Sequence, residues 1–108
     1  MATFEDFSKL EIRAGTIVSI EAVPETDKLL KLTVDFGEEA KRTVVSGIRM
    51  YFPEFEVLEG TQALFVTNLE PRKIKEIESQ AMILGVDADG GYVLLRPEQT
   101  VSNGARVR

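Results

Sequence analysis

Residues 30–36 alternate between apolar and polar side chains, and this pattern restricts the fold more than any other stretch of the chain. The apolar positions are Leu30, Leu32, Val34 and Phe36. Because successive side chains of an extended backbone point to opposite sides, these four fall on one face. The period of two is typical of a strand that buries one face, so the segment predicts a β-strand packed on a core.

Other segments with strand character surround this one. We expect strands at residues 10–22, 41–45, 62–67, 80–86 and 92–96, and a terminal pairing at Arg106 and Val107. Gly15 predicts a bulge or sharp bend in the first strand, and residues 53–58 predict a short helix that ends at Gly60. This order indicates an all-β OB-fold, a five-stranded barrel with a short helix between strands 3 and 4 and terminal extensions. We expect one domain over residues 1–108.

The composition excludes several classes of function. The 108 residues contain no cysteine and no histidine, which removes disulfides, thiolate nucleophiles, the usual general base and the commonest transition-metal ligand. We therefore expect no enzyme, no cofactor and no metal site. No segment has the roughly 18 consecutive apolar residues of a membrane span, and the first residues lack the features of a signal peptide. A cytoplasmic protein without a membrane partner is expected.

Basic residues gather in two windows although the formal net charge is −5. The windows contain Lys41, Arg42 and Arg49, and then Arg72, Lys73 and Lys75. A solvated edge strand would explain such a cluster, because lysines discourage edge pairing. Phosphate binding is the alternative, and the second window supports it by following the fourth strand, where OB-folds border their binding groove. The residue types alone leave both interpretations open.

The linear pattern is more specific than the charge. The runs VVSGI at 44–48, NLEPRK at 68–73 and SQAM at 79–82 resemble the tRNA-binding domain that occurs alone or appended to methionyl-tRNA synthetase. The resemblance implies an OB-fold that binds the outer corner of tRNA through shape and backbone contacts, which suits A-form RNA because side chains cannot easily read its deep major groove. Glu76 stands where this family often has glycine.

The resemblance also implies site residues and partners. The implied tRNA contacts are Asn68, Lys73, Lys75, Ser79 and Met82, with Lys41, Arg42 and Ser46 as neighbours and Arg72 added from its charge alone. Freestanding members commonly form homodimers through their terminal regions, so Phe4, Phe7 and Val107 are the expected dimer interface. The expected partners are tRNA, a second copy of the chain and an aminoacyl-tRNA synthetase, and no DNA.

Two alternatives remain within the same resemblance. CsaA-type proteins, which are associated with secretion and bind peptides, share the short dimeric format and the sequence Asp35, Phe36, Gly37 after the second strand. A module that docks on a synthetase without touching RNA is the other alternative. The sequences SGI at 46–48 and NLEP at 68–71 favour the tRNA-binding branch.

Overall fold

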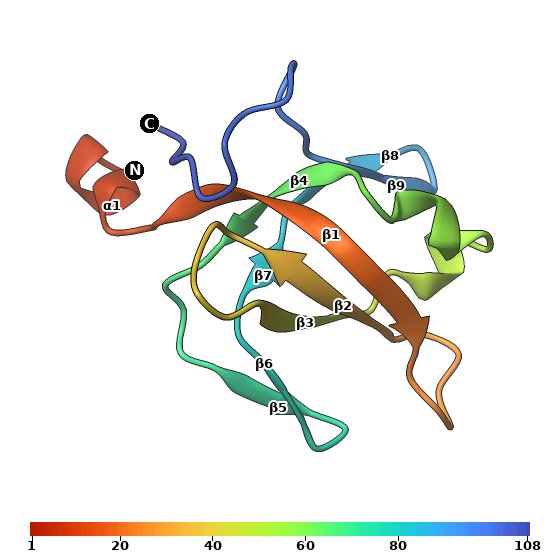
Figure 1. The fold of residues 1–108 in the computed structure, drawn as a ribbon. Helices are drawn as coiled ribbons and strands as arrows, with labels where there is room; N and C mark the ends of the chain where they lie inside the picture. Colours follow the sequence, from red (N-terminus) through yellow and green to blue (C-terminus); the bar gives the residue numbers. More distant parts are fainter.

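The chain forms a nearly closed β-barrel in a computed structural model that describes all 108 residues (Figure 1). Its antiparallel main sheet has the strand order β3-β2-β1-β4-β7. The strands are β1 (Ile12–Ala22), β2 (Leu30–Asp35), β3 (Arg42–Ser46), β4 (Gln62–Val66) and β7 (Met82–Ile83). The all-β, OB-like barrel predicted from the strand order is therefore confirmed.

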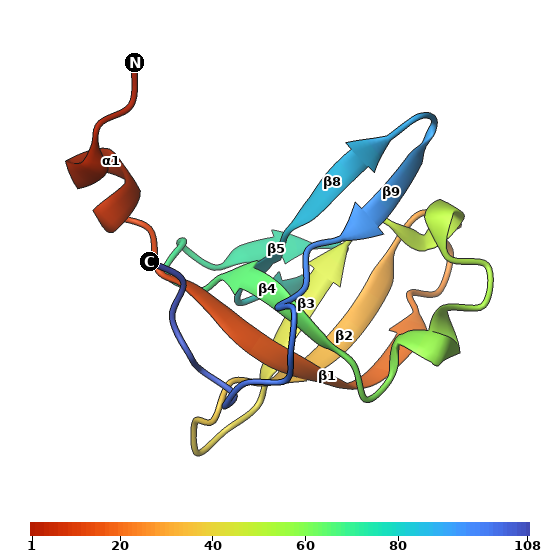
Figure 2. The same ribbon diagram turned by 90° about the horizontal axis from the view of Figure 1, so that it is seen from above.

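Short elements lie around this barrel. They are the helix α1 (Phe4–Ser8), the 3-10 turns η1 (Arg49–Tyr51) and η2 (Phe55–Leu58), and the hairpins β5 (Arg72–Ile74) with β6 (Ile77–Ser79) and β8 (Gly85–Ala88) with β9 (Gly91–Leu94). Figure 2 shows α1 and the β8–β9 hairpin projecting from the barrel. None of the helices has the length and apolarity to cross a bilayer.

Two predicted elements differ in detail. The single strand expected at 80–86 is divided at Leu84 into β7 and β8. Leu84 donates its N–H to Leu64 O of β4 at 2.9 Å, and its carbonyl oxygen accepts from the N–H of Leu95, after β9, at 3.1 Å. The helix expected at 53–58 is the 3-10 turn η2, preceded by a second such turn.

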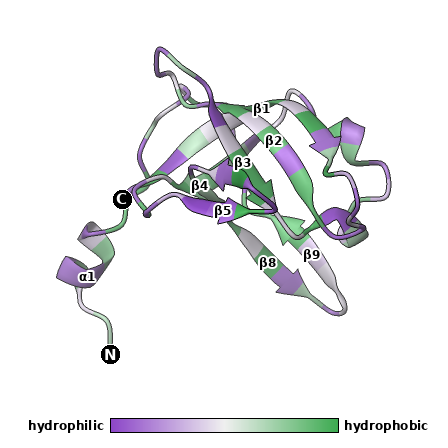
Figure 3. Cartoon of the chain, turned by 90° about the horizontal axis from the view of Figure 1, so that it is seen from below, coloured by the Kyte–Doolittle hydropathy of each residue, from purple (hydrophilic) through white to green (hydrophobic).

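The core is built on the apolar face of β2. The side chains of Leu30, Leu32 and Val34 are completely buried, and they alternate with more polar residues along the strand (Figure 3). Phe36, directly after β2, meets Phe65 of β4 edge to face, with ring centroids 5.1 Å apart. Such a pair contributes stability beyond its buried area.

Gly15 has a different role from the one predicted. The register shift of β1 against β2 lies between Ile17 and Ser19, so the bulge is at Val18. A Cβ atom at Gly15 would lie only 2.6 Å from atoms of both Val34 and Phe36. The absence of a side chain at Gly15 therefore lets the core pack against β1, and the predicted bulge position was wrong.

The end of the chain lies along β1, as predicted for residues 106 and 107. Arg106 forms an antiparallel bridge with Arg13, and Val107 donates its N–H to Ile12 O at 2.8 Å. Ala14 donates to Ala105 O at 2.9 Å. The two termini consequently lie at the same end of the molecule (Figure 1).

The barrel is closed by side chains where β3 has no neighbouring strand in the sheet. The N–H groups of Thr43 and Val45 donate to Gln80 Oε1 at 2.8 Å and to Ser79 Oγ at 2.9 Å, and Gln80 N–H donates to Thr43 O at 2.8 Å. The Ser79 hydroxyl is itself buried and donates to Ala81 O at 3.1 Å. We call these contacts between β3 and residues 79–81 the closing seam.

Replacing Ser79 with alanine should weaken the seam measurably. The buried N–H of Val45 would lose its acceptor, which costs about 1 to 3 kcal/mol of unfolding free energy. Urea denaturation of Ser79→Ala beside Ser102→Ala, an exposed serine, measures the difference. Equal stabilities of the two variants would show that the seam hydroxyl is dispensable.

Candidate nucleic-acid interface

The second basic window forms the β5–β6 hairpin rather than an irregular loop. Its register pairs Arg72 with Ser79 and Lys73 with Glu78. The turn residues Lys75 and Glu76 have φ of 53° and 65°. Positive φ at both positions of a two-residue turn is the requirement of type I′, which usually employs Asn-Gly because residues with a larger side chain are strained there.

The hairpin separates the basic residues from one another. Because side chains alternate along a strand, Arg72 lies on the same face as Ile74, whereas Lys73 lies on the other face opposite Glu78. Lys75 is at the tip. None of the five ion pairs in the molecule involves these three bases or the neighbouring glutamates at 70, 76 and 78. The positive charges of Arg72, Lys73 and Lys75 are therefore free to interact with an external anion.

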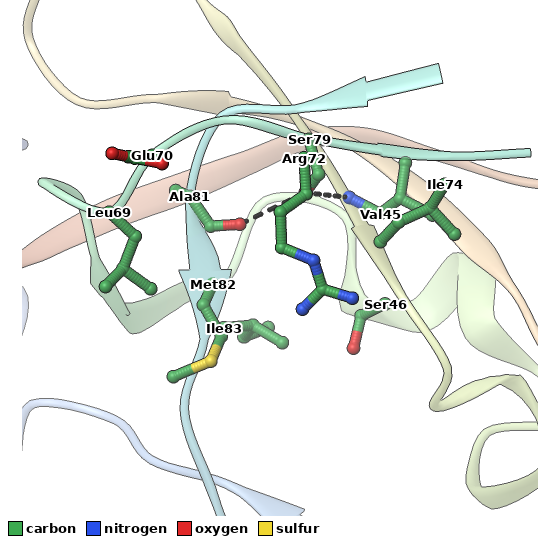
Figure 4. A pocket seen from close by; sticks show the side chains of 10 residues that line it. All are labelled: Val45, Ser46, Leu69, Glu70, Arg72, Ile74, Ser79, Ala81, Met82 and Ile83. Atoms are coloured by element: carbon green, nitrogen blue, oxygen red, sulfur yellow. Dashed lines mark hydrogen bonds between the residues drawn. The ribbon is translucent and has the colours of Figure 1, made fainter. Parts of the chain in front are cut away.

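A pocket of about 80 Å³ lies between this hairpin, the end of β3 and β7 (Figure 4). Its apolar walls are formed by Val45, Leu69, Ile74, Ala81, Met82 and Ile83, and its polar residues are Ser46, Glu70, Arg72 and Ser79. The Arg72 side chain extends from β5 toward the pocket (Figure 4). The structure thus brings together four of the predicted contact residues, namely Ser46, Arg72, Ser79 and Met82.

Arg42, in contrast, is fully occupied within the barrel. Its guanidinium donates to both carboxylate oxygens of Glu38 at 2.9 and 2.8 Å, and to Thr67 O at 2.7 Å and Gln80 O at 3.2 Å. It also lies 5.4 Å from the centre of the Phe36 ring. The side chain therefore ties β3 to the end of β4 and to the closing seam.

Arg13 joins the same cluster and was not predicted as a site residue. Its Nη2 donates to Glu38 at 3.0 Å, 25 positions along the chain. The hydrogen bonds from Arg42 and then Arg13 lower the pKa of Glu38 from 4.5 to about 2, against the raising effect of burial. Glu38 is consequently ionised at neutral pH and neutralises charge that could otherwise attract phosphate.

The other predicted residues fall into two groups. Asn68 is engaged at both ends of its amide, accepting from Glu11 N–H at 2.7 Å and donating to Lys9 O at 2.7 Å. Like Ser79 in the seam, it fixes the backbone. Lys41 is exposed directly before β3 and has no ion pair, and Met82 is 47% exposed at the pocket.

The predicted dimer residues share one surface. Phe4 and Phe7 are 79% and 38% exposed, and α1 buries none of its residues. Together with Leu10 and Val107 they line a cavity between α1 and the end of the chain. We call this set, Phe4, Phe7, Leu10 and Val107, the terminal surface.

Comparison with known proteins identifies the family. Residues 12–106 match the family described as "Putative tRNA binding domain". The chain belongs to this tRNA-binding domain family. It is 50% identical over 105 residues to the methionine–tRNA ligase of Methanococcoides burtonii, a match that covers 96% of this chain but only 15% of the ligase. The domain therefore corresponds to a small part of that enzyme.

Solved structures resemble the domain over its whole length. The MetRS related protein from Pyrococcus horikoshii superposes with a TM-score of 0.91 at 38% identity, covering 100% of this chain and 98% of the other. The chaperone CsaA from Bacillus anthracis superposes with a TM-score of 0.88 at 31% identity, covering 100% and 99%. The resemblance inferred from the motifs is confirmed, and it extends to both branches considered.

Replacing Glu76 of this tRNA-binding domain with glycine should stabilise it. Glycine adopts the positive φ of the turn without strain. Its greater conformational freedom in the unfolded chain offsets part of this gain, so the free energy of unfolding should rise by about 0.5 to 1 kcal/mol. Thermal or urea unfolding measures it. Glu78→Gly is the matched control, because it removes the same charge from the adjacent strand but should destabilise the hairpin. A loss of stability in both variants would contradict the assignment of strain to Glu76.

Proposed function

We propose that this domain binds folded tRNA through the surface formed by Lys41, the β5–β6 hairpin and the adjacent pocket. The observation that carries the proposal is the set of exposed bases on the hairpin, Arg72, Lys73 and Lys75, none of which has an ion pair. Each of these three basic side chains can displace condensed counterions from an RNA backbone.

The shape of this surface supports structure-specific recognition. The hairpin projects from the barrel (Figure 1), so it can lie along a folded RNA and contact phosphates without reading bases in the deep major groove. The net charge of −5 opposes long-range attraction. Affinity then depends on the local fit between the hairpin and the RNA backbone, which distinguishes folded tRNA from arbitrary RNA.

Other motif residues support this surface from within. Arg42, Asn68 and Ser79 form hydrogen bonds with the backbone of their own chain, so in this proposal they fix the backbone around the hairpin and do not touch the RNA. The similarity to part of a methionine–tRNA ligase supports action beside an aminoacyl-tRNA synthetase, either within one chain or as a separate partner. Joining the domain to such an enzyme would raise the effective concentration of tRNA at its active site.

A second function has a specific observation in its favour. The chaperone CsaA resembles the domain over the full length of both chains, and the pocket has mainly apolar walls that could accept a side chain of an extended peptide. Peptide binding of this kind would depend weakly on salt, whereas phosphate binding depends on it strongly.

Charge reversal at the hairpin tests the tRNA proposal. With about four to six phosphate contacts, log K should fall against log salt with a slope of about −3 to −5, and Lys73→Glu with Lys75→Glu should weaken binding at least tenfold and reduce that slope by about 2. The melting temperature should change little, because exposed charges contribute little to folding. Fluorescence titration of tRNA at several salt concentrations measures both quantities.

The matched control reverses two exposed bases away from the hairpin, Lys9→Glu with Arg96→Glu. It changes the net charge equally and should leave most of the affinity. Equal losses in the two double variants would show bulk electrostatics instead of a site. Binding of an unfolded peptide but not of tRNA at low salt would support the chaperone function and overturn the proposal.

We also propose that two copies pair through the terminal surface. An α1 helix that buries no residue on its own barrel leaves Phe4 in water unless a second chain covers it. Sedimentation should give twice the chain mass of 12.0 kDa, and Phe4→Ser with Phe7→Ser should give the monomer. Met50→Ser with Val57→Ser, at two other exposed apolar positions, should leave the dimer intact, and a monomeric parent protein would refute the pairing.

A further inference from the structure

The pocket beside the hairpin combines Arg72 with polar residues that phosphate binding alone does not explain. Arg72, Ser46 and Glu70 are among the residues that line it, and none of their side chains has a hydrogen bond or ion pair within the chain. The remaining walls are mostly apolar. An apolar pocket with a few converging polar groups is typical of a site for a small organic group.

We propose that this pocket binds one unstacked nucleobase from a loop of the bound RNA. The inference rests on the proposed tRNA binding and adds to it a second kind of contact. Proteins recognise RNA mainly at unstacked bases, which they stack on aromatic rings or on the plane of an arginine. Here Arg72 supplies such a plane, and Leu69 and Met82 supply apolar contacts for the rest of the base.

The charges of the pocket favour a base over a phosphate. Glu70 would repel a phosphate group that entered beside it, but its carboxylate can accept hydrogen bonds from the amino group of a base. Ser46 can donate or accept at the same edge. Adenine, guanine and cytosine carry an exocyclic amino group and uracil does not, so uracil is the base that suits the pocket least.

In this proposal, one face of the hairpin contacts the RNA backbone and the other face contacts the nucleobase. Because Arg72 and Lys73 are consecutive in β5, they point to opposite faces. A loop of RNA that crosses this strand would place a phosphate beside Lys73 and its base toward Arg72 and Met82. The pocket thus selects RNA whose folded form presents an unstacked base, in addition to its shape.

The substitution Arg72→Lys separates a stacked guanidinium from a simple positive charge. Lysine keeps the charge but lacks the plane, so the affinity for tRNA should fall about tenfold while the salt slope stays unchanged. Lys73→Arg is the conservative control and should have little effect. Retained affinity in Arg72→Lys would show that Arg72 acts only as a phosphate contact, and the base-binding inference would be wrong.

Methyl NMR gives an independent measurement, because the chain has only three methionines, Met1, Met50 and Met82. A base stacked in the pocket should shift the Met82 methyl signal through its ring current, whereas the Met50 signal should not move when tRNA is added. Binding of tRNA without movement of the Met82 signal would overturn the base pocket and leave the proposed function intact. Absence of any tRNA binding would overturn both, and a Met82 shift caused only by an extended peptide would assign the pocket to peptides.

Discussion

The edge of β3 that has no neighbouring strand in the sheet is the constraint on which the rest of the structure depends. A barrel needs a partner for the N–H groups of Thr43 and Val45, and the chain supplies side-chain oxygens from Gln80 and Ser79 in place of a strand. Arg42 reinforces this closing seam by bonding to the carbonyl of Gln80. Because the β5–β6 hairpin ends at Ser79, the seam also fixes the hairpin, and the pocket forms between the two. The residues that close the barrel therefore also hold the candidate site in place.

The parts of the fold that follow from local patterns could be predicted from the sequence. The alternation of β2 follows from its buried face, and the barrel order followed from the succession of such strands. The β5–β6 hairpin was missed because its turn uses Lys75 and Glu76 where type I′ turns usually have Asn-Gly. The cluster of Arg13, Glu38 and Arg42 was equally hidden, since residues 25 positions apart meet only after folding.

The family motif combines two kinds of residue that a sequence cannot separate. Asn68 and Ser79 have polar side chains suited to contact RNA, yet both bond to the backbone of their own chain. Arg42 carries the positive charge expected of a phosphate contact but forms an ion pair with Glu38. Four of the predicted basic residues have no ion pair, namely Lys41 and the three on the hairpin. These are the residues through which the acidic domain would contact an anionic partner. A match to a binding motif therefore includes residues that hold the fold together as well as residues that are free to contact a partner.

Amide hydrogen exchange of the domain with and without tRNA can locate the RNA, because it reports on the closing seam and the hairpin in one experiment. If the RNA binds at the hairpin, exchange on tRNA binding should slow in residues 43–46 and 72–83, with little change in residues 49–60 around η1 and η2. Slower exchange confined to residues 49–60 or to α1 and the end of the chain, with the hairpin unaffected, would place the RNA elsewhere and refute binding at the hairpin.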